Sequence, residues 1–269
     1  AVMQAAGKPT VLLVGQQHGD EPAGSEALLV IARELAQGLL QPVLERINVV
    51  IVPRANPDGA AIDQRATADG LDMNRDHLLL NTPEAQALAR LARDYKPTVV
   101  VDAHEYTVVG RYLQKFGAVQ KFDALFQYAT TANLPEFLTK AAEEWYRRPL
   151  LAALKGQNLS SEWYYTTSSD LADKKISMGG TQPDTGRNVN GLKNAVSVLI
   201  ETRGGFDFTG ADCHCVAHQP VHAEARGLMN SGIEIRQDLI SDQAGEKAWA
   251  DRLARILGEI EATLRAQKV

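Results

Sequence analysis

The stretch Val11-Leu12-Leu13-Val14-Gly15-Gln16-Gln17-His18-Gly19-Asp20-Glu21-Pro22 joins a short apolar run to a polar loop. The apolar run predicts a buried strand, and a strand that ends in such a loop carries its polar side chains to the edge of a sheet, where active sites are usually built. The imidazole of His18 and the carboxylate of Glu21 form an H-x-x-E pair, so both can reach one metal ion. Such a pair is common by chance, so it indicates a metal site only if a third ligand and a general base follow later strands.

The size and composition of the chain are those of a soluble globular protein. It has 269 residues, of which 45% are hydrophobic and 23% charged, and we predict one catalytic domain over residues 1–269. The net charge of -5 gives no reason to expect nucleic acid or an anionic membrane as a partner. No apolar run approaches the roughly 20 residues that span a bilayer, so no membrane span is expected. None of these totals determines the oligomeric state.

Short β-rich runs alternate with helical stretches, which predicts an α/β fold with a sheet covered on both faces. The runs are apolar without clear alternation, as expected for strands buried on both sides. The predicted strands are Thr10–Val14, Ile47–Val52, Thr98–Asp102 and Ala195–Ile200. The predicted helices are Gly24–Leu40, Pro83–Tyr95, Asp123–Glu144 and roughly Gly245–Gln267. Two Gly/Asn/Asp-rich stretches, Asn56–Asp76 and Met178–Gly191, are long for inert connections and are expected to be functional loops.

Two later strand ends supply what the H-x-x-E pair lacks. His104 follows the run Val99-Val100-Val101 and is the candidate third ligand, since catalytic zinc takes three protein ligands of the His₂Glu type and leaves a position for water. Glu201 ends the run Ala195–Ile200 and is the candidate general base. Two alternatives stay open: Glu201 pairs with Arg203, or Glu105 is the base. Alternation along a strand, however, points Glu105 away from the face that carries His104.

One Gly/Asp-rich loop carries Arg65, Asn74 and Arg75. The planar guanidinium of arginine matches a carboxylate in bidentate fashion. Near a metal, one arginine can hold a substrate carboxylate while another stabilises a tetrahedral oxyanion. The alternative is that these are solvated loop arginines.

In chain order, the motifs are His18 with Glu21, Asn56-Pro57-Asp58-Gly59, Arg65, Asp72-Met73-Asn74-Arg75, Asp102-Ala103-His104 and Glu201. In this order and with these spacings the sequence resembles the zinc metallocarboxypeptidases of the carboxypeptidase A type. The resemblance implies a three-layer α/β/α sandwich whose mixed, mostly parallel central sheet has about eight strands. It also implies one zinc ion and a substrate with a free carboxylate.

The resemblance implies a role for each matching position. His18, Glu21 and His104 correspond to the zinc ligands, and Glu201 to the base that activates water and then protonates the leaving amine. Asp72 corresponds to the carboxylate that orients the first zinc histidine.

The arginine-bearing loop has implied roles as well. Arg65 corresponds to the arginine that polarises the scissile carbonyl and stabilises the oxyanion. Asn74 and Arg75 correspond to the pair that clamps the terminal carboxylate of the substrate.

The sequence departs from the family pattern in two places. The family has a mobile tyrosine some twenty residues before the catalytic glutamate, but Lys174–Gly180 contains none. Arg187, in the same loop, is a candidate for the specificity pocket and would favour an acidic side chain. Only seventeen residues precede His18, fewer than in typical members, so either the sheet edge is supplied otherwise or the chain is truncated at its N-terminus. No signal peptide is visible, and a cytoplasmic location or, after signal removal, a periplasmic or secreted one both stay open.

A second group of metal-binding residue types lies in Cys213–His222, which holds both cysteines and three histidines. Its spacing fits no standard structural zinc pattern, and we interpret it as a loop or helix start with incidental ligands rather than a metal site. Cys213 and Cys215 are awkwardly spaced for a disulfide.

Together, the residues predict a zinc-dependent metallocarboxypeptidase that hydrolyses the C-terminal peptide bond of peptides. The first alternative is an N-acyl amino acid deacylase or a cell-wall peptide amidase on the same scaffold. The second is a catalytically silent binding module, against which the presence of all three ligands and Glu201 argues.

Overall fold

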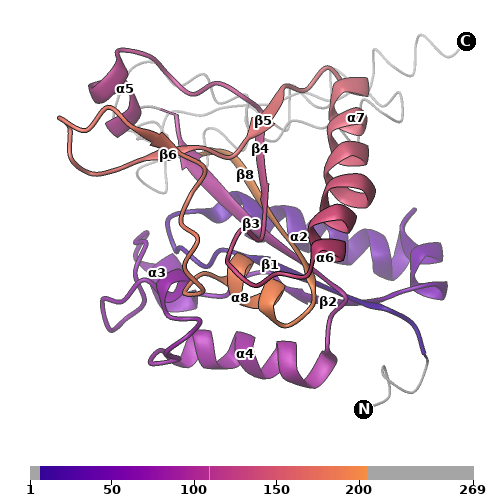
Figure 1. The fold of residues 1–269 in the computed structure, drawn as a ribbon. Coiled ribbons are helices and arrows are strands. Elements are labelled where there is room, and N and C mark those ends of the chain that lie inside the picture. The colour runs from indigo at the N-terminus through magenta and orange to yellow at the C-terminus, as the bar shows by residue number, and fades with distance from the viewer. Residues whose placement is uncertain (1–6, 109, 205–269) are drawn as a thin grey trace, which may run out of the picture. The chain divides into compact units, whose positions relative to one another are not determined.

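The structure is a computed structural model that describes residues 7–108 and 110–204. Within this part, the main sheet has six strands in the order β2-β1-β3-β8-β4-β5 (Figure 1). A second sheet pairs β6 with β7. The strands are β1 (Thr10–Gly15), β2 (Asn48–Val52), β3 (Val99–Thr107), β4 (Ala124–Tyr128), β5 (Ser161–Trp163), β6 (Thr166–Thr167), β7 (Ile176–Ser177) and β8 (Val196–Gly204).

The main sheet is mixed but mostly parallel. Strand β1 is parallel to β2 and to β3, and β3 is parallel to β8. Strand β4 runs antiparallel to β8, and β5 is parallel to β4. The predicted α/β fold is therefore confirmed, with six strands in the described residues instead of about eight.

Helices lie on both faces of this sheet, as predicted. They are α2 (Pro22–Gln37), α3 (Pro57–Ala61), α4 (Pro83–Tyr95), α5 (Arg111–Phe116), α6 (Glu136–Ala141), α7 (Arg148–Gly156) and α8 (Gly186–Leu192). Short helical turns cover Gln41–Glu45, Met73–Arg75 and Ala142–Arg147. No helix in the described residues has the length and apolar character that crossing a bilayer would require.

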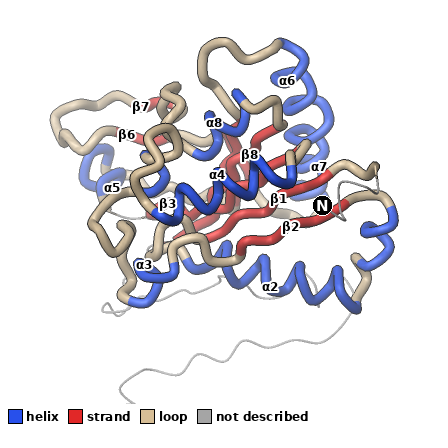
Figure 2. Tube along the Cα trace, turned by 90° about the horizontal axis from the view of Figure 1, so that it is seen from below, coloured by secondary structure: helices blue, strands red, loops and turns tan. Residues whose placement is uncertain are grey.

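Alternation along the strands divides the core into two clusters. Leu12, Val14 and Val100 pack with Leu88 of α4 on one face, where α8 also lies (Figure 2). Val99, Val196 and Val198 pack with residues of α6 and α7 on the other face. Helix α2 covers this second face as well, because Gly24 lies against Ala103. Burying each such aliphatic side chain contributes about 1.5–3 kcal/mol to folding.

Strands β3 and β8 run further than the sequence predicted, to Thr107 and Gly204 instead of Asp102 and Ile200. The apolar runs stop earlier, but the backbone ladder continues because the two strands pair residue by residue. His104 pairs with Glu201 in this register, so the two side chains leave the sheet on the same face. The extended strands thus bring the candidate ligand and the candidate base together.

The predicted helix Asp123–Glu144 was wrong over its first half. Strand β4 occupies Ala124–Tyr128, and the helix begins only at Glu136, after Pro135. Helical periodicity could not show that Leu125 and Phe126 would pair with both β8 and β5. Tertiary pairing decided the conformation of this segment.

The stretch Met178–Gly191, predicted as a loop, contains the start of α8. Thr185 begins this helix, and its side chain accepts a hydrogen bond from the Asn188 amide. Two of its residues, Arg187 and Asn188, are buried despite being polar. The predicted helix Gly245–Gln267 and the segment Cys213–His222 lie outside the described residues.

Candidate metal centre and substrate cleft

The H-x-x-E loop leaves the end of β1 through an unusual backbone conformation. Gln16 adopts a positive φ of 53°, and its side-chain amide donates to the Gly19 carbonyl at 2.9 Å. Gly19 tolerates no side chain, because an added Cβ would lie 2.0 Å from the Gly59 carbonyl carbon. Asn56 holds the opposing segment by accepting from the Gly59 amide and donating to the Gln17 carbonyl. The loop is therefore fixed against α3, with His18 and Glu21 both buried.

The three predicted metal ligands converge on one point. Glu21 lies between the two imidazoles: its Oε1 is 2.7 Å from His18 Nδ1, and its Oε2 is 2.7 Å from His104 Nδ1. The two Nδ1 atoms are 3.2 Å apart. Among the described residues these three form a group whose ligand atoms lie within 4.8 Å of one another, close enough to share one metal ion.

A carboxylate stands behind each imidazole. Asp72 Oδ1 lies 3.3 Å from His18 Nε2, and Asp102 Oδ1 lies 3.1 Å from His104 Nε2. A carboxylate can only accept hydrogen bonds, so these contacts require a proton on each Nε2 and leave each Nδ1 to face Glu21. Histidines that bind metals usually have such a partner, which fixes the tautomer and the ring orientation.

This donor set fits zinc. Two imidazole nitrogens and a carboxylate, all acceptors, meet at one buried point and need a cation between them. Burial opposes the charged form of both imidazoles, yet Asp72 and Glu21 beside His18, and Asp102 and Glu21 beside His104, hold both pKa values above 6.5. Protons therefore compete with a metal for the same nitrogens, as at metal sites generally.

Of these contacts, the sequence indicated the role of Asp72 but assigned none to Asp102. The available signal was alternation along β3, which places Asp102 and His104 on the same face.

Glu201 lies beside this cluster on the neighbouring strand. It is buried, and burial raises the pKa of its carboxyl to about 7, although the neighbouring imidazole of His104 acts to lower it. Within the described residues, the Glu201 carboxylate forms no hydrogen bond and no ion pair. A carboxylate with these properties suits proton transfer near neutral pH.

The contacts of Glu105 and Arg203 disfavour both alternatives to Glu201 as a free base. Glu105 points to the opposite face, where it accepts a hydrogen bond from the Ala23 amide at the start of α2. Arg203 pairs with Asp123 rather than with Glu201. The expectation from strand alternation is therefore confirmed for Glu105.

The arginine-bearing loop lies next to the ligands. Arg65 is held by Asp72 Oδ2 through two hydrogen bonds of 3.0 and 2.8 Å, and its Nη1 lies 3.1 Å from His18 Nδ1. Asn74 Nδ2 lies 3.1 Å from His104 Nε2, while its Oδ1 accepts from the Gly186 amide. Arg75 is exposed and donates to the Asn74 carbonyl.

A cleft of about 740 Å³ opens over these groups. It brings together all the predicted site residues, namely His18, Glu21, Arg65, Asn74, Arg75, His104, Arg187 and Glu201. Arg187 is only 4% exposed, and its Nη2 donates to the Gly180 carbonyl at 2.9 Å. Its Nε has no hydrogen-bond partner among the described residues.

The sequence did not predict that Tyr164 lines this cleft. Gly179 separates it from Arg187: a Cβ at Gly179 would lie 3.0 Å from Tyr164 Cε1 and 3.3 Å from Arg187 Nη2. Burial, with Glu201 nearby, raises the pKa of Tyr164 to about 12, so it stays a neutral phenol. No tyrosine occurs in Lys174–Gly180, and only the fold reveals that one from the segment after β5 enters the cleft.

Comparison with known proteins agrees with this geometry. Residues 3–208 match the family model described as zinc carboxypeptidase. A probable carboxypeptidase 2 of Trichophyton verrucosum (strain HKI 0517) is 32% identical over 200 residues, which cover 73% of this chain and 39% of that protein. Carboxypeptidase 2 of Trichophyton rubrum is also 32% identical, over 73% of this chain and 37% of its own length. The chain thus spans well under half the length of these relatives.

Solved structures share the fold. A putative carboxypeptidase A from Shewanella denitrificans superimposes with a TM-score of 0.53 at 18% identity, covering 73% of this chain and 48% of that one. Bovine thrombin-activatable fibrinolysis inhibitor gives a TM-score of 0.53 at 15% identity, covering 75% of this chain and 74% of that one. With the family model matching most of its length, this chain belongs to the zinc carboxypeptidase family of metallopeptidases.

Proposed function

We propose that this protein is a zinc-dependent carboxypeptidase that hydrolyses the C-terminal peptide bond of peptides. The observation that carries the proposal is the pairing of His104 with Glu201 on adjacent strands, which sets a free carboxylate beside the His18–Glu21–His104 cluster. Those three residues would hold one zinc ion. Zinc in such a site acts as a Lewis acid that lowers the pKa of water and polarises a carbonyl.

The other residues divide the remaining chemistry. Glu201 accepts the proton of the attacking water and passes it to the leaving amine. Arg65, whose Nη1 faces His18, stabilises the negative charge that develops on the carbonyl oxygen. Asp72 holds both the His18 ring and the Arg65 guanidinium, so a single carboxylate orients a ligand and an oxyanion donor.

Asn74 and Arg75 are proposed to bind the terminal carboxylate of the substrate. Since the contact with Asp102 requires the proton on His104 Nε2, the Asn74 Nδ2 amide has no acceptor at that ring and is available to a ligand in the cleft. Arg75 adds an exposed guanidinium next to it. Arg–carboxylate pairs of this kind are short and charge-assisted.

The test of this function is the substrate terminus. Peptides with a free C-terminal carboxylate should be cleaved at least about 100-fold faster, in kcat/KM, than their amidated counterparts, and Arg75→Ala should reduce that ratio. Arg90→Ala, at an exposed position of α4, is the matched control and should leave the ratio unchanged.

Two outcomes would point to the alternatives on the same scaffold. Equal cleavage of amidated peptides would indicate a cell-wall peptide amidase. Release of an acyl group from N-acyl amino acids, without cleavage of peptides, would indicate a deacylase.

We also propose that Arg187 selects an acidic side chain in the substrate. Arg187 is a buried guanidinium, and none of the described carboxylates forms an ion pair with it. Burying a charge without a partner is costly, and burial accordingly lowers the pKa of Arg187. A carboxylate from the substrate would supply the missing partner.

Replacing Arg187 tests this specificity. Arg187→Met should lower the ratio of kcat/KM for C-terminal Glu over C-terminal Leu peptides by about 10- to 100-fold, because a hydrogen bond to a charged group contributes about 1.5–3 kcal/mol. Arg187→Lys keeps the positive charge but not the planar, forked guanidinium, so it should lower this Glu-to-Leu ratio less than Arg187→Met does. The proposal is wrong if Arg187→Met melts like the parent and keeps the same Glu-to-Leu ratio.

A further inference from the structure

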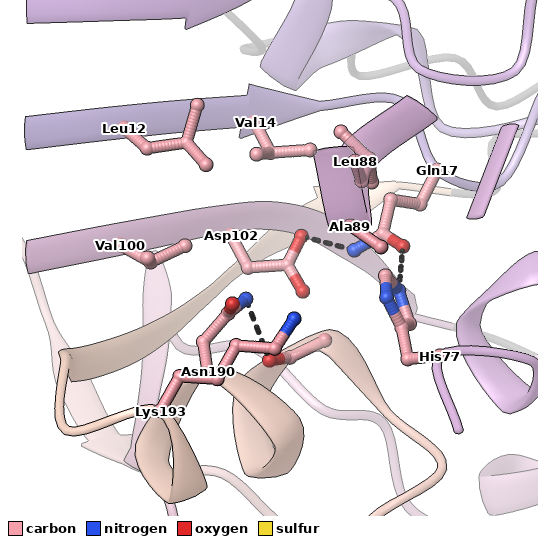
Figure 3. A pocket seen from close by; sticks show the side chains of 11 residues that line it. Leu12, Val14, Gln17, His77, Leu88, Ala89, Val100, Asp102, Asn190 and Lys193 are labelled. Carbon is pink, nitrogen blue, oxygen red and sulfur yellow. Dashed lines mark hydrogen bonds between the residues drawn. The ribbon is translucent and has the colours of Figure 1, made fainter. Parts of the chain in front are cut away.

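A small cavity lies behind the metal cluster, on the same face of β3 as His104, and is lined by residues of α4 and α8. Its volume is about 10 Å³, close to the space one water occupies. Figure 3 shows its two kinds of wall: Leu12, Val14, Leu88 and Val100 are apolar, whereas Gln17, His77 and Asp102 point toward one another. Neither Gln17 nor His77 has a part in the chemistry described so far.

These polar groups form one chain of hydrogen bonds that ends on a metal ligand. His77 Nε2 lies 2.7 Å from Gln17 Oε1, and Gln17 Nε2 lies 2.7 Å from Asp102 Oδ1 (Figure 3). Asp102 Oδ1 in turn lies 3.1 Å from His104 Nε2. Gln17 is 1% exposed and Asp102 2%, so water does not substitute for these contacts.

The direction of every bond in the chain is determined. Asp102, as a carboxylate, only accepts, so Gln17 must present its NH₂ to it and its carbonyl oxygen to His77. His77 must then carry its proton on Nε2. Burial lowers the pKa of His77 to about 4, which keeps the ring neutral with that single proton at neutral pH.

Close packing keeps the chain in place. An added Cβ at Gly186 would lie 3.1 Å from His77 Nε2, 3.2 Å from Gln17 Nε2 and 3.3 Å from Asp102 Oδ2. The backbone at Gly186 therefore lies against all three groups. Its amide in turn donates to Asn74, on the cleft side.

We propose that Gln17 and His77 are positioning residues of the metal centre, which act through Asp102 to hold the His104 ring with Nδ1 toward the metal. Without Gln17 the Asp102 carboxylate loses its second donor and is free to rotate, since its Oδ2 has no partner among the described residues. The His104 ring then loses its fixed orientation. This inference rests on the proposed zinc site, and it extends the partners of that site by two residues.

Zinc affinity, measured by competition with a chromophoric chelator, tests the inference. Gln17→Met removes both hydrogen bonds at similar size and should weaken zinc binding by about 10-fold, at the lower end of the range for partners of metal ligands. His77→Leu should weaken it less. The double variant should equal Gln17→Met alone, because His77 acts only through Gln17.

Leu88→Met is the matched control, since it changes the apolar wall of the same cavity without touching the chain of hydrogen bonds. A second measurement is the visible spectrum of the cobalt-substituted protein, which responds to ligand geometry. It should change in Gln17→Met and not in Leu88→Met.

Two results would overturn the inference, and they are distinguishable. If the parent takes up no zinc, the proposed metal centre fails and the inference with it. If the parent binds zinc but Gln17→Met binds it equally well and has an unchanged cobalt spectrum, only the positioning role fails. Additive losses in the double variant would likewise show that His77 does not act through Gln17.

Discussion

Replacing Glu201 with Gln is expected to lower kcat/KM for a free-carboxylate peptide by about 100- to 10,000-fold, with zinc content unchanged. The amide keeps the size and position of the carboxyl group but cannot take a proton from water. Glu201 is not a metal ligand in the His18–Glu21–His104 cluster, so the metal should stay bound. Steady-state kinetics together with metal analysis on the same preparation measures both quantities.

Glu105→Gln is the matched control for this experiment. Glu105 is adjacent to His104 in sequence, but its side chain is on the other face of the sheet, against the start of α2. The Glu105→Gln variant should therefore retain most of the activity of the parent. A Glu201→Gln protein that turns over peptide like the parent would show that Glu201 is not the base, and loss of activity in both variants would point to a structural effect.

Replacing Glu21 with Gln is expected to weaken zinc binding by roughly 100- to 1,000-fold, and activity should fall with zinc occupancy. Apparent zinc-binding free energies of about 10–16 kcal/mol are shared among four ligands in structural sites, so one ligand accounts for a few kcal/mol. Glu21 lies 2.7 Å from a nitrogen of each imidazole and is the only anion among the three ligands. A neutral amide supplies neither the charge nor the same affinity.

The measurement is zinc stoichiometry after dialysis against buffer with a weak chelator. Glu26→Gln, on the exposed side of α2, is the control and should keep a full complement of zinc. Adding zinc in excess should restore part of the activity of Glu21→Gln, because His18 and His104 remain. Full zinc occupancy in Glu21→Gln after the same dialysis would contradict the ligand assignment.

The predicted strands next to apolar runs were close to those observed, because a buried parallel strand needs a continuous run of Val, Ile and Leu. The run Val11–Val14 and the run ending at Val101 both belong to such strands. The segment from Asp123 was wrong for the opposite reason. Its sequence suits a helix or a strand. Residues Ala124–Tyr128 form a strand because they pair with the edge of β8.

The sequence by itself determined which chemistry the chain carries. The H-x-x-E pair after an apolar run, His104, Glu201 and the arginine-bearing loop were all predicted as site residues from residue type and position relative to strand ends. That was possible because parallel strands deliver their carboxyl ends to one edge of a sheet. Their identification depended only on local pattern and chain order.

Only the tertiary structure decided how these groups are held. The register of β3 and β8 sets Glu201 beside His104, Asp102 and Gln17 lie behind the ring, and Gly179 lies between Tyr164 and Arg187. The β3–β8 pairing and the Gln17–Asp102 hydrogen bond join residues far apart in the chain, and these partners are set by strand order and burial rather than by local sequence. The H-x-x-E pair can thus be identified from the sequence, whereas the chain of contacts through Gln17 and Asp102 that holds the His104 ring is identified only in the assembled sheet.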